Sequence, residues 1–310
     1  MRRFYSSFKN IDTRHVLATV YIAAILAVFV AVRTFWTPDI MFLILLGLFL
    51  ILGQAKSFVT YFLPFVALIL SYEKLRSLAT HINKHVHYME MVHADRWLTG
   101  GILPTTWLQQ HWYHGHVAWY DFYFYFLYMM HFVVPVVLAV IIWKYRTKEY
   151  WFYITALVIL SYAGFITYVL FPAAPPWLAS ELGKIEPIHR ISSDVWAAFG
   201  VKNFSTYYQQ LSPNPVAAMP SLHAAYPFLF TLIARRLWGN RAFLITLLYP
   251  ISVWIGIVYL GEHYVVDALA GILYAILSYL SAPYVLRFTS RMFHKVITSS
   301  RNGRKRPNHD

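Results

Sequence analysis

Long runs of hydrophobic residues, separated by short polar clusters, dominate the chain. Most runs are close to the roughly 20 residues that a helix needs to cross the hydrocarbon core of a membrane. The run at 40–70 is longer, and as one helix it would extend for about 46 Å, so the polar break at 53–56 predicts two short crossings. The pattern predicts eight spanning helices, at 16–35, 40–52, 57–70, 118–143, 150–171, 222–238, 242–260 and 264–286.

Two stretches lack this spanning pattern. Residues 71–118 mix charges, aromatic side chains and seven histidines, which predicts an amphipathic segment at the membrane interface. Residues 172–220 hold seven of the 15 prolines and predict an ordered loop. The predicted fold class is therefore all-α: a polytopic integral membrane helical bundle of about eight transmembrane helices with an interfacial amphipathic segment. We expect three parts, namely N-terminal transmembrane helices at 1–70, a membrane catalytic domain at 71–286 and a basic tail at 287–310.

Composition excludes most soluble classes of protein. Apolar residues make up 59% of the chain and charged residues 13%, against roughly 45–50% and about 25% in soluble domains. The net charge of +13 could indicate nucleic-acid binding. The lysines and arginines instead occupy the chain ends and short loops, as cytoplasmic anchors facing anionic lipid do, so no nucleic-acid partner is expected. The absence of cysteine excludes disulfides and thiolate chemistry.

The positions of the basic residues also predict orientation. If the N-terminus is cytoplasmic, eight crossings place the basic turns at 144–148 and 235–241, and the tail, on the cytoplasmic side. The segments 71–118 and 172–220 then lie on the opposite side. Seven crossings would invert the N-terminus against its own basic residues. We therefore expect a multi-pass membrane protein with both termini in the cytoplasm.

Two short blocks carry candidate chemistry. The first, around His223, lies where the proline-rich loop meets a spanning helix, and the second contains His263 and Asp267 at the start of the last helix. Residues four apart share one face of a helix, so Asp267 can accept a hydrogen bond from one ring nitrogen of His263. Such a bond fixes the tautomer and leaves the other nitrogen with a lone pair, as a histidine nucleophile or general base requires.

The spacing predicts that the two blocks meet. Forty residues separate His223 from His263, and one helix, a turn and a returning helix account for nearly all of them. Ser221 stands where a helix begins, and the unpaired backbone N–H groups there favour an anion. Two histidines, a carboxylate and an anion site suit phosphoryl transfer. An isolated His-x-x-x-Asp pair is more often structural, so the inference depends on the second histidine.

These motifs resemble a known family. Pro-Ser-Leu-His at 220–223 and His-Tyr-Val-Val-Asp at 263–267 resemble the second and third signatures of the phosphatidic acid phosphatase type 2 superfamily. The blocks at 95–98, 104–109 and 170–177 resemble the branch that contains inositol phosphorylceramide synthases, which are inositol phosphotransferases, and their bacterial relatives. The resemblance implies three catalytic residues: His263 forms a phosphohistidine, Asp267 orients it, and His223 protonates the leaving group.

The chain also departs from the superfamily pattern. Leu222 stands where a glycine is usual, Ile257 stands where an arginine is usual, and the basic first motif is absent. The cations that usually hold the phosphate are thus missing or replaced. Candidate replacements on the outer side are Arg76, Arg96, Lys184 and Arg190.

The predicted substrate-binding residues come from several segments: Ser221, Pro175, Pro176, Trp177, Arg76, Arg96 and His131. The block containing the two prolines and Trp177 is expected to shape a headgroup pocket, although such residues also end helices at interfaces. His131 lies in the middle of a spanning run, where a buried structural histidine and a cavity residue are equally compatible with the sequence.

The predicted function is a membrane-embedded lipid phosphotransferase that cleaves a lipid phosphoester and passes the phosphorus-containing group to a polyol such as inositol. Its partners are a lipid phosphate or phospholipid substrate, a possible polyol acceptor and membrane lipids, and its site faces away from the cytoplasm. A lipid phosphate phosphatase with water as acceptor is the alternative. More remote is a transporter or a metal-handling protein, because His81 and His85 have metal-ligand spacing. An interfacial segment explains those histidines better, and neither a metal nor a cofactor is expected.

Overall fold

The structure is a computed structural model that describes residues 12–32, 38–200 and 214–303. Contacts divide the chain into two units, 1–73 and 74–310, which are considered separately below. The domain boundaries expected at residues 70 and 286 stay predictions. The helices are α2 (Thr13–Val32), α3 (Pro38–Ile51), α4 (Ala55–Ile82), α5 (Glu90–Thr99), α6 (Pro104–Trp112), α7 (Trp119–Tyr145), α8 (Thr147–Leu170), α9 (Pro176–Glu181), α10 (Ile191–Ala198), α12 (Leu222–Trp238), α13 (Asn240–Thr246), α14 (Leu248–Tyr259) and α15 (Val265–Gly303).

The predicted all-helical class is confirmed, since the described residues form helices and only isolated β-bridges. By length and composition, four helical stretches in the described part could cross a membrane: Ala55–Tyr72, Thr147–Leu170, Asn240–Tyr259 and Val265–Met292. The bent helix α7 would make a fifth. The predicted count of eight is therefore not confirmed, because α2 and α3 contribute only shorter apolar segments and α12 has 17 residues.

Two helix ends differ from expectation. The interfacial segment was expected from residue 71, but α4 continues to Ile82 before the short helices α5 and α6 begin. Helix α15 continues to Gly303, well beyond the expected end of the span at 286. In both places the hydropathy changes but no helix-breaking residue intervenes, so the backbone keeps its helical hydrogen bonds.

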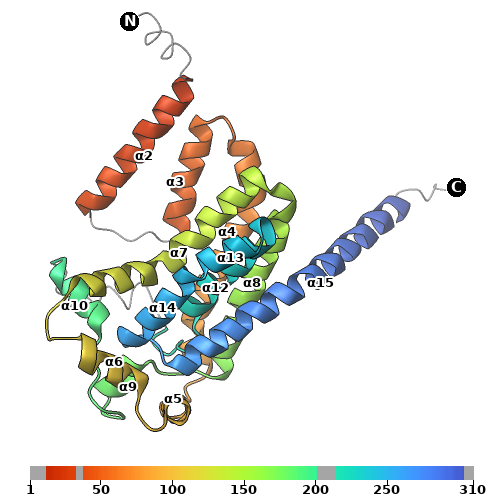
Figure 1. Ribbon diagram of the computed structural model, residues 1–310. Coiled ribbons are helices and arrows are strands. Elements are labelled where there is room, and N and C mark those ends of the chain that lie inside the picture. The colour runs from red at the N-terminus through yellow and green to blue at the C-terminus, as the bar shows by residue number, and fades with distance from the viewer. Residues whose placement is uncertain (1–11, 33–37, 201–213, 304–310) are drawn as a thin grey trace, which may run out of the picture. The chain divides into compact units, whose positions relative to one another are not determined.

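The second unit contains a bundle in which α12 contacts α7, α8, α14 and α15 (Figure 1). Small residues let these helices approach closely. A Cβ built on Gly164 of α8 would lie 3.1 Å from the side chain of Leu222, and one on Gly256 of α14 would lie 2.8 Å from Phe124. Leu222, which replaces the usual glycine of the second motif, is thus accommodated by a glycine on the neighbouring helix.

A layer of short helices and loops covers one end of this bundle, where α5, α6 and α9 gather near the start of α15 (Figure 1). Three chain segments pair there through parallel bridges of His87 with Ala173 and of Ala173 with Ala217. Beneath them lies a buried apolar cluster: Met91, Val92, Leu103, Ala173, Ala218 and Tyr264. The layer fixes the loops that lead into α12 and α15. The segment 172–220 contains α9 and α10, so the predicted proline-rich loop is partly helical.

Candidate active site

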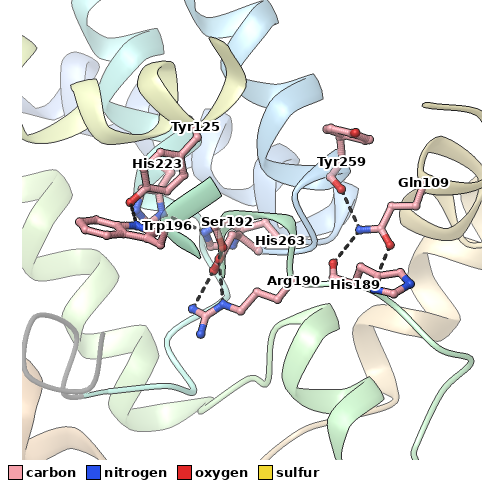
Figure 2. A network of polar contacts seen from close by, with 10 residues as sticks. Gln109, Tyr125, His189, Arg190, Ser192, Trp196, His223, Tyr259 and His263 are labelled. Atoms are coloured by element: carbon pink, nitrogen blue, oxygen red, sulfur yellow. Dashed lines mark hydrogen bonds and ion pairs between the residues drawn. The ribbon is translucent and has the colours of Figure 1, made fainter. Parts of the chain in front are cut away.

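His223 and His263 meet where α12 and α15 begin. The Nδ1 atom of His223, in the first turn of α12, lies 2.9 Å from Nε2 of His263, in the turn before α15 (Figure 2). The helix–turn–helix spacing between the two residues therefore brings them together at one end of the bundle. His263 is buried, with only 4% of its surface exposed. A direct contact between two imidazoles means that one ring nitrogen donates and the other accepts.

Asp267 lies on the opposite side of the His263 ring. Its Oδ2 atom is 3.5 Å from Nδ1 of His263 and accepts a 2.9 Å hydrogen bond from the backbone N–H of Tyr264. The ring nitrogen and Oδ1 of Asp267 are both buried, and within the described residues neither makes a hydrogen bond. A charge-assisted bond between the two would be about 2.7–2.9 Å long, so a small ring rotation suffices to form it. In this arrangement Nδ1 of His263 faces the Asp267 carboxylate, and Nε2 of His263 faces His223.

Ser221 connects the starts of the two helices. Its Oγ atom accepts the backbone N–H of Ala224 at 3.2 Å and thereby caps α12, as serine commonly does. Its own backbone N–H donates to the carbonyl oxygen of Asp267 at 2.9 Å. The carbonyl of Pro220, one residue earlier, accepts the hydroxyl of Tyr168 at 2.8 Å. Ser221 is fully buried in this arrangement, and its expected contact with substrate stays a prediction.

Asp95 of α5 caps the helix that carries Asp267. Its two carboxylate oxygens accept the backbone N–H groups of Val265 and Val266 at 2.9 and 2.8 Å. Burial raises the pKa of Asp95 to about 6, and the nearby negative charge of Asp267 adds to the rise. Asp95 lies in the block at 95–98 that carries the family resemblance, but no role for Asp95 could be predicted from that block. Asp95 and Val265 are 170 residues apart in the sequence, so no argument from local spacing could predict this contact.

Two residues of α7 pack against His223. The ring of Tyr128 stacks on His223 with a centroid distance of 4.2 Å, and His131 meets it edge-on at 4.0 Å. Nδ1 of His131 donates to the carbonyl of Tyr128 at 2.7 Å. Helix α7 bends by 52° just after His131, where Pro135 cannot donate a hydrogen bond to the His131 carbonyl. His131 is thus a buried neighbour of His223, and its expected role in substrate binding stays a prediction.

A second polar cluster surrounds Glu262, the residue immediately before His263. The buried Glu262 carboxylate accepts Nε and Nη2 of Arg190 at 3.0 and 3.3 Å, and it also accepts the hydroxyl of Ser192 (Figure 2). The Arg190 guanidinium lies 3.8 Å from the centre of the Trp177 ring. The backbone N–H of Trp177 donates to the carbonyl of Gly261 at 3.1 Å. Trp177, a predicted substrate-binding residue, is therefore bonded to the turn that carries His263.

The other predicted binding residues occupy different positions. Pro175 precedes the first residue of α9, Pro176, and both are buried. Arg96 forms a 2.6 Å ion pair with Glu186, which also accepts the hydroxyl of Thr106. Lys184 is exposed in the turn after α9. The side chain of Arg76 lies outside the described part of the structure.

Gln109 joins the covering layer to the bundle. Its Nε2 atom donates to the carbonyls of His189 and Tyr259 at 2.8 and 2.9 Å, and its Oε1 atom accepts the His189 N–H at 2.9 Å (Figure 2). The hydroxyl of Tyr259 in turn donates to Asp121 in the first turn of α7 at 2.6 Å. These bonds tie the segment that carries Arg190 to the end of α14, just before the His263 turn. No group of three or more potential metal ligands is found among the residues whose positions are described.

Comparison with known proteins gives two matches. The family model of the PAP2 superfamily matches residues 89–281. A phosphoinositol dihydroceramide synthase from Bacteroides thetaiotaomicron is 31% identical over 163 residues, which are 49% of this chain and 52% of that protein. The match therefore spans about half the length of this relative. No solved structure matches the chain.

Proposed function

Because the chain belongs to the PAP2 superfamily, as its paired histidine motifs indicate, we propose that it is an enzyme that cleaves a lipid phosphoester and transfers the phosphorus-containing group to a hydroxyl acceptor. The observation that supports this most is the buried His263, which lies between Asp267 and His223. An oriented imidazole with a second imidazole beside its reactive nitrogen suits nucleophilic catalysis at phosphorus.

The proposed reaction has two steps. In the first, the lone pair of His263 Nε2 attacks phosphorus, the bond from phosphorus to the leaving oxygen breaks, and His223 gives that oxygen a proton. In the second, the acceptor oxygen attacks phosphorus, the P–N bond breaks, and His223 takes the proton of the acceptor hydroxyl. Asp267 stabilises the positive charge that His263 carries while it is phosphorylated.

Substrate entry requires movement of one ring. The 2.9 Å contact between His223 and His263 leaves no space for a phosphorus atom between the two nitrogens. We expect His223 to turn aside when the phosphate enters and then to face the leaving oxygen. Its ring stacks on Tyr128 and meets the edge of His131.

Inositol is the polyol that we propose the site handles. The sequence motifs favour a free polyol as the acceptor. The name of the Bacteroides relative describes a phosphoinositol group joined to dihydroceramide, and by analogy the acceptor could equally be the hydroxyl of a sphingolipid. Either acceptor must be bound to compete with water at about 55 M, and the effective molarities of oriented groups are high enough for this.

The proposed function is tested by following labelled phosphorus from the lipid to its acceptor. Purified protein in vesicles receives a lipid phosphodiester labelled at phosphorus, together with increasing inositol or a ceramide. We expect label to move to one of these acceptors and the product ratio to rise with acceptor concentration. Release of hydrolysis products that no acceptor shifts would replace the transferase by a lipid phosphatase. Absence of any product from every lipid phosphoester tried would contradict both enzymatic functions.

The orientation forms a second part of the proposal: the two histidines face the non-cytoplasmic side, and both termini lie in the cytoplasm. The cysteine-free chain allows a paired test at two exposed positions, Lys184→Cys just after α9 and Arg241→Cys in the first turn of α13. In sealed cells, a membrane-impermeant thiol reagent should label the first variant and should label the second only after the membrane is opened. The reverse labelling pattern would contradict the orientation.

A further inference from the structure

We propose that Asp95 is a positioning residue of the transfer reaction, which holds the first turn of α15 so that Asp267 stays against the His263 ring. It acts through the backbone of Val265 and Val266 and not by contact with substrate. The proposal rests on the proposed function, because it deepens the account of that same site. It gives a part in the reaction to α5, a helix of the covering layer that carries neither histidine of the pair.

The start of α15 lacks a cap from the residue that precedes it. That residue is Tyr264, and tyrosine has no short side-chain oxygen of the kind with which serine, threonine, aspartate or asparagine accepts an N–H group of the first turn. Asp95 supplies the missing acceptor from another helix. Its Oδ2 and Oδ1 atoms accept the N–H groups of Val265 and Val266, the first two residues of α15, at 2.9 and 2.8 Å.

The carboxylate of Asp267 has two partners that compete for it. Its Oδ2 atom accepts the Tyr264 N–H at 2.9 Å and lies 3.5 Å from Nδ1 of His263. A carboxylate in the first turn of a helix is attracted to the free N–H groups there. Because Asp95 already occupies the next two N–H groups of the turn, the Asp267 carboxylate is not drawn to them and stays beside the ring. Without Asp95, we expect Asp267 to turn toward these N–H groups and away from His263.

A packed apolar surface holds Asp95 at this place. Met91 and Val92, one turn earlier on α5, belong to the same buried cluster as Tyr264, and Val266 packs against that cluster. The helix that carries Asp95 is therefore docked on the residue that follows His263, so the distance from its carboxylate to the first turn of α15 is fixed by side-chain packing.

The burial of Asp95 also favours a role at the site. The residue is fully buried, and among the residues that the structure describes its carboxylate bonds to backbone N–H groups and to no cation. Burial raises its pKa to about 6, and the negative charge of Asp267 adds to the rise. A buried carboxylate without a cation is costly, which fits a role in positioning the reacting groups better than a role in packing.

The experiment must separate positioning from simple loss of stability. A variant that is partly unfolded contains less active protein, whereas a misplaced Asp267 lowers the rate constant of each active molecule. We therefore measure the rate constant and the amplitude of label transfer in a single turnover, with enzyme in excess over a phosphorus-labelled lipid phosphoester. KM and the unfolding temperature are measured alongside. The pH is kept well above the Asp95 pKa of about 6, so that this carboxylate is ionised.

Two substitutions of Asp95 are compared with two controls. Asp95→Ala removes both acceptors, and Asp95→Asn keeps one oxygen for one of the two N–H groups. The first control, Glu90→Gln, changes an exposed carboxylate of the same helix, which contacts His87 at 2.6 Å. The second, Asp121→Asn, changes a buried carboxylate that likewise accepts a backbone N–H at the start of a helix, α7. It measures what the loss of a buried capping charge does by itself.

We expect Asp95→Ala to lower the single-turnover rate constant by about 100-fold with little change in KM, because misplacement of a reacting group by about 1 Å costs that much. Asp95→Asn should recover part of this loss and stay about ten-fold slow. Asp121→Asn should lower the unfolding temperature and the amplitude but not the rate constant, and Glu90→Gln should behave as wild type. A wild-type rate constant for Asp95→Ala would overturn the proposal, because Asp95 would then only stabilise the fold. If Asp95→Ala does not fold, the rate constant of Asp95→Asn decides in the same way.

A failure of the proposed function gives a different result. If the wild-type protein transfers no label from any lipid phosphoester, the placement of the ring is measured by the rate at which diethyl pyrocarbonate modifies His263. The exposed His111 of α6 serves as the internal reference. Faster modification of His263 in folded Asp95→Asn, and not in Asp121→Asn, would support Asp95 as the residue that positions the ring. Equal effects of the two variants, or no effect of either, would overturn that assignment.

Discussion

Replacing His263 with alanine is expected to abolish turnover while leaving the helical bundle folded. His263 Nε2 is the atom that faces His223 and is proposed to bond to phosphorus, and alanine offers no nucleophile in its place. The contacts of the lost ring with His223 and Asp267 are polar, so the apolar packing of the bundle should persist. The measurement is label transfer from the lipid phosphoester, with circular dichroism and the unfolding temperature as folding controls.

Asp267→Asn is expected to lower kcat strongly without abolishing activity. An asparagine can still accept the Tyr264 N–H, so the start of α15 should form. It cannot stabilise a positively charged His263, and comparable substitutions in histidine-dependent triads cost about 10⁴-fold in kcat. A matched control is Glu149→Gln, a carboxylate in the first turn of α8. Wild-type rates for either His263→Ala or Asp267→Asn would contradict the assigned roles.

The meeting of the two histidines could be predicted from the sequence because it depends on one local rule. Two helices joined by a tight turn return the chain to the same end, and the spacing of His223 and His263 satisfies that geometry. The break between α3 and α4 was equally predictable, since Gly53 and Gln54 interrupt an apolar run. In both cases the signal lies within about 40 residues of contiguous sequence.

The surroundings of the pair could not be predicted in this way. Asp95 reaches α15 across 170 residues, and Gln109 reaches Tyr259 across 150. Arg190 and Glu262 are 72 residues apart. In the sequence, nothing distinguishes Glu262 from an ordinary charged residue beside the start of a helix. Each contact depends on how the covering layer docks on the bundle, which hydropathy does not encode. Hydropathy also does not show where α4 and α15 end, because it reports membrane burial and not the end of a helix.

Gly271→Ala should disrupt the site from a position that touches no substrate. Gly271 lies one turn after Asp267 on α15, and a Cβ built there would be 2.2 Å from the carbonyl oxygen of Ser221. The obstacle is backbone, so no side-chain rotation can relieve it. Ser221 is also bonded through its N–H to the Asp267 carbonyl, which fixes the distance between the two helix starts. The alanine must therefore push α12 away from α15.

The sign of the effect distinguishes this clash from helix propensity. In an exposed helix, glycine to alanine is stabilising by about 1 kcal/mol. Here we expect the unfolding temperature to fall and activity to drop by about 100-fold, because misplacement of reacting groups by about 1 Å costs that much. The control is Gly164→Ala in α8, where the new Cβ would meet the flexible end of Leu222 at 3.1 Å and should change activity only a few-fold. Equal stability and equal turnover for the two variants would mean that the contact between Ser221 and α15 does not position His223 against His263.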